Sequence, residues 1–282
     1  MIAKRIIARL DIKGPNLVKG IHLEGLRVLG RPADFAKYYY ENGADELIFM
    51  DVVASLYGRN SLHNIISETA KSIFIPITVG GGLRSIADIK SVLRAGADKV
   101  CLNTAAINNP TLIEEAAKIF GSSTIVVSIE AIKGPDGRYL AYTDNGREYT
   151  GIDAIEWATK VCEAGAGEIL VTSVDMEGTG EGFDHELIKS INEVVTIPVV
   201  AHGGPAHEQH VVEMFEVTNA DAVAVASMLH YEAIEKIDHN LLTSEGNTRF
   251  LKEKRRFHKF VPTGMPELKE HINNNNIRVR FE

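Results

Sequence analysis

The sequence predicts an α/β fold, a (βα)8 TIM barrel with a half-barrel internal repeat, and three observations support this. Short apolar runs alternate with longer amphipathic stretches, which is typical of β-α units around a parallel sheet. The second half of the chain repeats motifs of the first half at an offset of about 120 residues. The length of 282 residues suits one barrel, so we expect residues 1–282 to form a single domain.

The apolar runs predict eight barrel strands, at residues 5–10, 46–51, 75–79, 99–103, 124–129, 168–173, 199–201 and 222–226. Helices are predicted between them, for example at residues 32–42, 85–95, 110–120 and 151–164. Gly43, Gly96 and Gly165 each end a helix just before a strand. An open dinucleotide-binding sheet is disfavoured, because no GxGxxG motif follows the first strand.

The repeat gives each half of the chain the same chemistry. Residues 5–11 (RIIARLD) lead into IKGP at 12–15, and residues 124–130 (TIVVSIE) lead into IKGP at 132–135. The glycines at 80–82 are echoed by Gly203 and Gly204. Each half thus offers one carboxylate and one glycine-rich loop that suits an anion. We therefore expect a site for a substrate with a charged group at each end.

Two segments interrupt the alternation. Residues 133–150 are rich in Gly, Asp and Tyr and are expected to form a long loop or a hairpin after the fifth strand. Residues 233–262 are expected to be an insertion after the eighth strand, at the active-site face, before a final helix at 266–273. The insertion is basic, with Arg249, Lys252, Lys254, Arg255, Arg256 and Lys259. Such a run is usually a solvated face, but over the mouth it could steer an anionic substrate.

Composition excludes several classes of function. The formal net charge of −8 argues against nucleic acid as the main partner. Cys101 and Cys162, the only cysteines, lack metal-ligand spacing and are interpreted as reduced, buried thiols of a cytoplasmic protein. We expect neither a metal nor a cofactor. No apolar run is long enough to span a membrane, and the N-terminus lacks a signal peptide's apolar region.

Asp11 and Glu130 are the candidate catalytic pair. They end strands one and five, which stand opposite each other in an eight-stranded barrel, so both carboxyl groups are expected at the mouth as general acid and base. The alternative is that each caps a helix or meets a lysine. The glycine loops at 80–82 and 203–204, with Asn103, Thr104 and Ser227 at following helix starts, predict two phosphate sites rather than simple turns.

Four charged residues begin strands at the opposite end of the barrel: Arg5, Glu46, Lys99 and Glu168. From position alone, a stabilising role is favoured there.

At this point the residues resemble one enzyme family, the cyclase (HisF-type) subunit of imidazole glycerol phosphate synthase. The similarity rests on residues 3–7 (AKRII), 17–20 (LVKG), 43–47 (GADEL), 78–84 (TVGGGLR), 95–100 (AGADKV), 165–170 (GAGEIL) and 175–179 (DMEGT). It covers nearly the whole chain outside 233–262. The resemblance implies a lyase of histidine biosynthesis that receives ammonia from a glutaminase (HisH-type) partner at the barrel bottom. The substrate would be a bisphosphorylated ribulosyl-formimino aminoimidazole carboxamide nucleotide, converted to imidazole glycerol phosphate and an aminoimidazole carboxamide ribonucleotide.

The resemblance also implies roles for individual residues. Asp11 matches the first catalytic carboxylate and Lys19 a loop lysine that helps to close the site. Gly82, Asn103 and Thr104 match one phosphate site; Gly178, Gly203 and Ser227 match the other, and Thr172, His202 and Gly204 are expected to contact the substrate too. Arg5, Glu46, Lys99 and Glu168 match a ring that gates ammonia, which reverses the preference for a stabilising role. Asp98 matches a position at the glutaminase contact.

The chain departs from the family at several positions of the reaction centre, including Ala8, which with Arg9 replaces a Pro-Cys pair. Glu130 and Glu177 stand where the family has aspartate, His202 replaces a serine, and Arg9 replaces a small residue beside Asp11. A shift of about 1 Å in a catalytic group can cost about two orders of magnitude in rate. Protonated, His202 could strengthen phosphate binding; otherwise it is a hydrogen-bonded residue of the mouth. These departures favour an alternative, a paralogue that channels ammonia for sugar amidination to another anionic acceptor. The preserved phosphate loops favour the cyclase, which is the preferred interpretation. A sister sugar-phosphate isomerase and a catalytically silent subunit are further alternatives.

Overall fold

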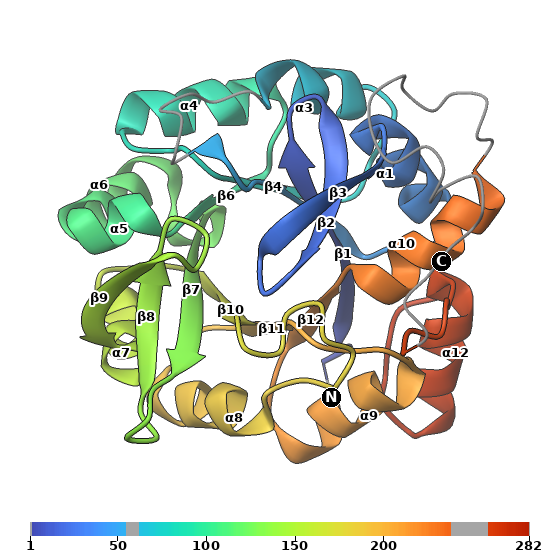
Figure 1. Ribbon diagram of the computed structural model, residues 1–282. Helices are drawn as coiled ribbons and strands as arrows, with labels where there is room; N and C mark the ends of the chain where they lie inside the picture. Colours follow the sequence, from blue (N-terminus) through green and yellow to red (C-terminus); the bar gives the residue numbers. More distant parts are fainter. Residues whose placement is uncertain (1, 55–61, 238–258, 282) are drawn as a thin grey trace.

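The computed structural model describes residues 2–54, 62–237 and 259–281, and it confirms the closed barrel. The strands follow the order β10, β11, β12, β1, β4, β5, β6, β7, and a further β10–β7 pairing closes the ring. The neighbouring pairs of this ring are parallel (Figure 1). The bounds are β1 (Arg5–Lys13), β4 (Glu46–Asp51), β5 (Ile77–Gly80), β6 (Lys99–Leu102), β7 (Ile125–Lys133), β10 (Glu168–Ser173), β11 (Val199–His202) and β12 (Ala222–Val225).

Helices surround the barrel and bury one apolar face each against it. Helix α4, for example, begins after Ser85, whose hydroxyl accepts a hydrogen bond from the Asp88 backbone, and ends at Gly96 in the left-handed conformation. The bounds are α1 (Pro32–Glu41), α3 (His63–Thr69), α4 (Ile86–Ala95), α5 (Thr104–Asn108), α6 (Thr111–Phe120), α7 (Ala154–Glu163), α8 (His185–Val194), α9 (Glu208–Val217), α10 (Ser227–Lys236) and α12 (Met265–Asn274). A 3-10 turn, η1 (Ser122–Thr124), precedes β7.

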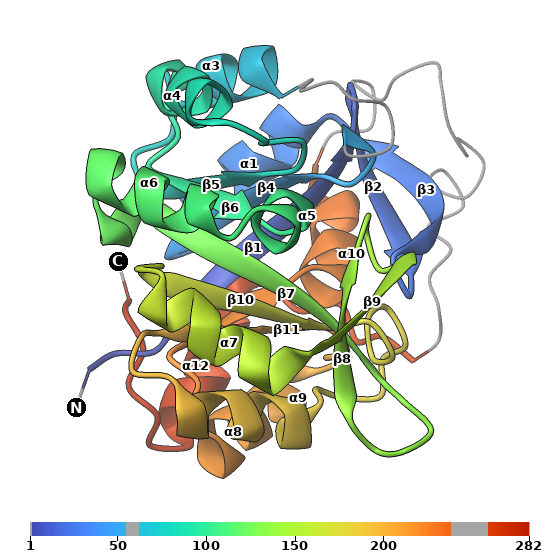
Figure 2. The same ribbon diagram turned by 90° about the vertical axis from the view of Figure 1, so that its left-hand side faces the viewer.

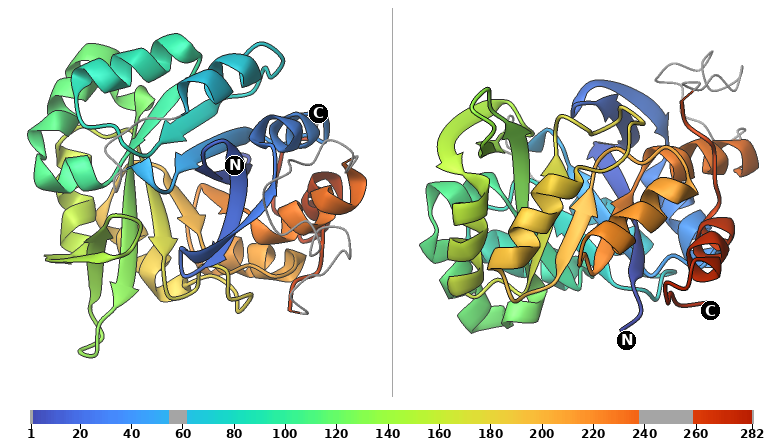
Figure 3. Two further views of the ribbon diagram at one scale, coloured as in Figure 1. Left: turned by 45° about the horizontal axis from the view of Figure 1, so that its top comes forward. Right: turned by 90° about the horizontal axis from the view of Figure 1, so that it is seen from below.

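Two β-hairpins extend from the same end of the barrel. The first consists of β2 (Asn16–Ile21) and β3 (Glu24–Gly30), and the second of β8 (Tyr139–Thr143) and β9 (Glu148–Asp153). They lie opposite the end that holds the chain termini (Figure 2 and Figure 3). Each hairpin pairs antiparallel with an extension of the strand before it, β1 or β7. These strands are therefore longer than predicted, and Asp11 and Glu130 lie within them.

The second hairpin confirms one of the two possibilities predicted for residues 133–150. The first hairpin was not predicted. Its turn contains His22 and Leu23 at φ +52° and +61°, a conformation that a sequence usually signals with glycine or asparagine. Lys19 therefore lies on a strand rather than in a loop. Helix α7 begins later than expected because β9 continues to Asp153, whose side chain then caps the helix.

The barrel interior contains an apolar layer between two polar ends. The layer includes Ile7, Ile48, Cys101, Val126 and Leu170. Strand alternation points Arg5, Arg9 and Asp11 into the same interior as Ile7.

A motif repeated around the barrel has a structural role. The carboxylates of Asp45, Asp98 and Asp221 accept hydrogen bonds from backbone N–H groups at the starts of neighbouring strands, at 2.7, 2.8 and 3.0 Å. Gly167 occupies the fourth equivalent position, where a Cβ atom would lie 2.2 Å from the Ser122 carbonyl oxygen. The repeated motif thus fixes the lower ends of the strands.

The predicted insertion is only partly within the described residues. Its first residues, 233–236, belong to helix α10, which continues to Lys236. Residues 238–258, with Arg249, Lys252, Lys254, Arg255 and Arg256, lie outside the described residues. Lys259 is exposed, and its Nζ lies 2.7 Å from Glu181.

The two cysteines are free, but only Cys101 is buried; Cys162 is half-buried, contrary to expectation. Among the described residues, no helix combines the length and apolar character required to cross a membrane.

Candidate active site

Two cavities at the hairpin end divide most of the expected substrate-binding residues between them. The first has a volume of about 240 Å³, and its lining includes Gly82, Asn103, Thr104 and Glu130. The second, of about 180 Å³, is lined in part by Lys19, Gly178 and Ser227. A small adjoining cavity shares these three residues and adds His202, Gly203 and Gly204. The structure therefore brings together the residues of each predicted phosphate site.

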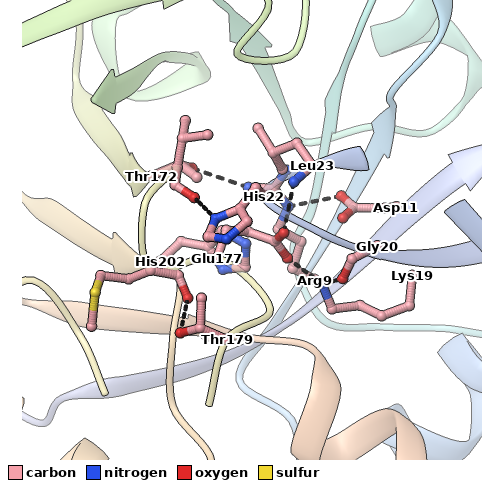
Figure 4. A network of polar contacts seen from close by, with 12 residues as sticks. Arg9, Asp11, Lys19, Gly20, His22, Leu23, Thr172, Glu177, Thr179 and His202 are labelled. Carbon is pink, nitrogen blue, oxygen red and sulfur yellow. Dashed lines mark hydrogen bonds and ion pairs between the residues drawn. The ribbon is translucent and has the colours of Figure 1, made fainter. Parts of the chain in front are cut away.

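Asp11 is a buried carboxylate with a buried counter-ion. The Nε atom of Arg9 donates a hydrogen bond to Asp11 Oδ1 at 2.8 Å, and both side chains are almost inaccessible to solvent (Figure 4). Burial alone would raise the pKa of Asp11, but the charges of Arg9 and Lys19 hold it below its usual value. Asp11 is therefore ionised at neutral pH.

Thr172 lies at the other end of the same arginine. Its hydroxyl accepts a hydrogen bond from Arg9 Nη1 at 3.2 Å, and its side chain is fully buried. In this structure Thr172 contacts Arg9 inside the barrel, and the contact with substrate that the sequence suggested stays a prediction.

Glu130 is a buried carboxyl group whose pKa is shifted in the opposite direction. It accepts a hydrogen bond from the Gly146 backbone at 2.8 Å. Burial raises the pKa of Glu130 to about 7, although Arg9, Gly146 and Asn103 act in the other direction. A large fraction of Glu130 therefore carries a proton at neutral pH, and the two carboxyl groups differ as a general acid and a general base must.

Lys19 is held by Glu177, with which it forms a buried ion pair. Glu177 also accepts hydrogen bonds from the backbone of Leu23, through its carboxylate, and of His22, through its carbonyl, both at 2.9 Å (Figure 4). The tip of the first hairpin is thus fastened to the loop after β10.

The second hairpin contacts the first at the same place. Asn145 Nδ2 donates to the Leu23 carbonyl at 2.9 Å. Its neighbour Gly146 is the donor to Glu130. Sequence analysis did not identify these two residues as part of the site; the Asp-Asn-Gly turn at 144–146 was the available signal.

His202 is buried and uncharged. Its Nδ1 lies 2.8 Å from the Ala224 carbonyl, so Nδ1 carries the proton, while Nε2 has no hydrogen-bond partner among the described residues. Burial and the charge of Arg9 hold the pKa of His202 well below its usual value. Of the two roles expected from the sequence, the hydrogen-bonded neutral residue fits, and the protonated phosphate ligand does not.

The glycine loop after β11 requires glycine for steric reasons. Gly204 has φ +109°, and a Cβ atom there would lie 1.7 Å from the Gly182 carbonyl oxygen. This close approach shapes the loop that lines the small cavity.

At the opposite end, the four predicted gate residues form a closed ring. Arg5 lies 2.7 Å from Glu46 and 2.5 Å from Glu168. Lys99 lies 2.9 Å from Glu46 and 3.0 Å from Glu168. Each carboxylate thus bridges both cations. Asp98, next to Lys99, is exposed at this end while one of its oxygens holds the Ile77 backbone.

Comparison with known proteins decides the family. A family model described as "Histidine biosynthesis protein" matches residues 5–235. The chain belongs to the histidine biosynthesis family. A "subunit HisF" of imidazole glycerol phosphate synthase from Legionella pneumophila is 60% identical over 200 residues, which are 71% of this chain and 94% of that protein. The HisF subunits of Bacillus cereus strains Q1 and G9842 are each 48% identical over 231 residues, 82% of this chain and 92% of theirs.

Within the histidine biosynthesis family, these relatives support an enzyme with the function of the cyclase subunit of imidazole glycerol phosphate synthase. They lend no support to the sugar-amidination alternative. None of the three relatives is named as an isomerase.

Proposed function

We propose that the protein uses ammonia to convert a bisphosphorylated ribulosyl-formimino aminoimidazole carboxamide nucleotide to imidazole glycerol phosphate and an aminoimidazole carboxamide ribonucleotide. The observation that carries this proposal is the placement of the two glycine loops: Gly81 and Gly82 line the first cavity, and Gly203 and Gly204 line the small cavity that adjoins the second. A substrate with a phosphate at each end would place one phosphate at each loop. Its reacting centre would then lie near Asp11, whose charge interacts with those of Lys19 and Glu130.

In this site Asp11 is the general base and Glu130 the general acid. Asp11 is kept ionised by Arg9, so it accepts a proton. Glu130 retains its proton to near neutral pH and can donate it to a leaving group. Glutamate in place of the family's aspartate is accommodated by the second hairpin, since the Gly146 backbone holds its carboxyl group.

The partner that we propose is a glutaminase subunit docked at the barrel bottom. The charged ring closes this end, so ammonia entering here must pass Arg5 or Lys99. Several exposed apolar side chains lie at the ends of helices or next to strand starts on the same face, with Ile2 89% and Phe74 79% exposed. The others are Ile119, Val194, Val217 and Phe281. Exposed apolar side chains on the face that carries the charged ring favour a protein interface there.

The test is ammonia-dependent turnover by the purified protein alone. With saturating ammonium at alkaline pH and the ribulosyl-formimino nucleotide, we expect imidazole glycerol phosphate to form. Asp11→Asn should abolish it, whereas Glu114→Gln, an exposed carboxylate on α6, is the matched control. No product from the unmodified protein under these conditions would contradict the proposal.

A further inference from the structure

Arg9 is a charged residue in the interior of the barrel, directly above the apolar layer. Only 1% of it is exposed. A guanidinium in such surroundings is tolerated only with close partners, because an unpaired buried charge is very unfavourable. Its partners therefore indicate its role.

The side chain of Arg9 spans the interior from one wall to another. Arg9 belongs to β1 and Thr172 to β10, and β12 and β11 lie between them in the ring. The 3.2 Å hydrogen bond to Thr172 thus anchors the guanidinium on a distant strand, while its Nε atom holds Asp11 at 2.8 Å. A planar guanidinium bound at two points has little freedom to rotate.

We propose that Arg9 is a positioning residue of the cyclase reaction: anchored by Thr172, it holds the Asp11 carboxylate in one orientation and in its ionised form. This inference rests on the proposed function, in which Asp11 is the base.

The other charged and titratable groups near Asp11 do not replace Arg9. Lys19 is already paired with Glu177. His202 and His230 are buried, and burial lowers the pKa of both, to about 3 for His230, so they carry no charge at neutral pH. Glu130 and Glu177 are acidic and would oppose ionisation of Asp11. Arg9 is therefore its principal counter-ion.

The experiment compares Arg9→Met, Arg9→Lys and Thr172→Val with the unmodified protein. Ammonia-dependent turnover is measured between about pH 5 and pH 9 and expressed per concentration of neutral NH3. In Arg9→Met, a buried carboxyl without a counter-ion should protonate within this range, so a new acidic limb should appear and kcat at neutral pH should fall about 100-fold. The KM for the nucleotide should change by less than about threefold.

The other two variants separate charge from orientation. Arg9→Lys should lack the acidic limb of Arg9→Met but recover only part of kcat. Lysine restores the positive charge, but it has no planar guanidinium that can be held at two points. Thr172→Val should lower kcat and keep the pH profile of the unmodified protein, without the new acidic limb. A loss of kcat in Arg9→Met with no acidic limb, or a change in KM alone, would overturn the inference.

Failure of this inference differs from failure of the proposed function. An unmodified protein without turnover contradicts the proposed function; an active protein whose Arg9→Met variant has the same pH profile contradicts only the role of Arg9. If Arg9→Met does not fold, as judged by circular dichroism, the carboxyl carbons of the unmodified protein are titrated by 13C NMR. The Asp11 signal is assigned by its absence in Asp11→Asn. A transition at or above the ordinary value of about 4 overturns the inference, and one clearly below it supports the inference.

Discussion

Lys19 and Glu177 form an ion pair beneath the first hairpin, with 5% and 2% of their side chains exposed. The same carboxylate accepts the backbone N–H of Leu23 at the hairpin tip. One buried contact therefore joins β2, the hairpin turn and the loop after β10. The charge of Lys19, which we propose contacts the substrate, is thus balanced by Glu177 in this structure.

Removing one partner of this ion pair should lower the stability of the protein much more than removing both charges. Lys19→Met leaves the Glu177 carboxylate buried without a counter-ion, and we expect the free energy of unfolding to fall by about 3–5 kcal/mol. The double variant Lys19→Met/Glu177→Gln keeps an acceptor for Leu23 and should recover much of that loss. Urea unfolding measures both. Lys118→Met, in an exposed pair on α6, is the control and should cost less than about 1 kcal/mol. Equal instability of the single and double variants would contradict the coupling.

Glu130 should make stability depend on pH. Its pKa in the folded protein is about 7, above the usual 4.5, so the folded state favours the neutral form. This contribution is fully present below about pH 4.5 and is lost as pH rises through about 7, because the unfolded chain ionises first. The total is about 3 kcal/mol.

The measurement is the free energy of unfolding of the unmodified protein relative to Glu130→Gln across this range. With rising pH, the unmodified protein should lose stability relative to Glu130→Gln, and this loss should level off above about pH 7. Glu114→Gln, which is exposed, should show no such trend. A difference that is constant with pH would mean that Glu130 titrates normally.

The barrel could be predicted, and the residues of the expected two-ended site could be grouped, because both depend on local patterns. Strand alternation, the helix-ending glycines and the repeated glycine loops each have a direct physical cause in the residues concerned. The positions of the predicted strand starts were enough to group Arg5, Glu46, Lys99 and Glu168 at one end of the barrel. That their ion pairs form a closed ring could be seen only in the structure.

Contacts between distant segments could not be predicted. The first hairpin turns at His22 and Leu23 without a turn signal, and its conformation is stabilised by Glu177 and Asn145, far away in the sequence. Arg9 could be recognised as unusual, but its partner Thr172 lies on another wall of the barrel. The neutral state of His202 depends on burial, which no local pattern specifies.

Opening the charged ring should make ammonia transfer inefficient. Arg5→Ala removes one of the two cations that bridge Glu46 and Glu168, so the ring no longer closes. In complex with the glutaminase partner, we expect the ratio of imidazole glycerol phosphate formed to glutamine hydrolysed to fall below that of the unmodified complex. Turnover supported by added ammonium should fall less. An unchanged ratio would show that the ring does not retain ammonia.

Gly204 provides the sharpest test of the second glycine loop, because a matched glycine separates backbone strain from collision. Gly204 and Gly121 both have positive φ, at +109° and +88°, so alanine at either should cost about 1–3 kcal/mol in backbone strain. At Gly121 a Cβ atom would meet nothing within 4 Å, whereas at Gly204 it would lie 1.7 Å from a carbonyl oxygen of the neighbouring segment. Gly204→Ala should therefore lose clearly more stability than Gly121→Ala.

Gly204→Ala should also weaken substrate binding, because the added Cβ atom displaces the glycine loop after β11. Since Gly204 lines the small cavity with Gly203 and Ser227, any Gly204→Ala protein that folds should show a KM for the bisphosphorylated nucleotide raised by at least about tenfold. Gly121→Ala should keep the unmodified KM, because Gly121 lies between α6 and η1, near the barrel bottom. Unfolding curves and steady-state kinetics on the two variants give both readouts. Equal stability and equal KM in the two variants would show that the loop tolerates a side chain, and that the close approach to Gly182 does not shape the phosphate site.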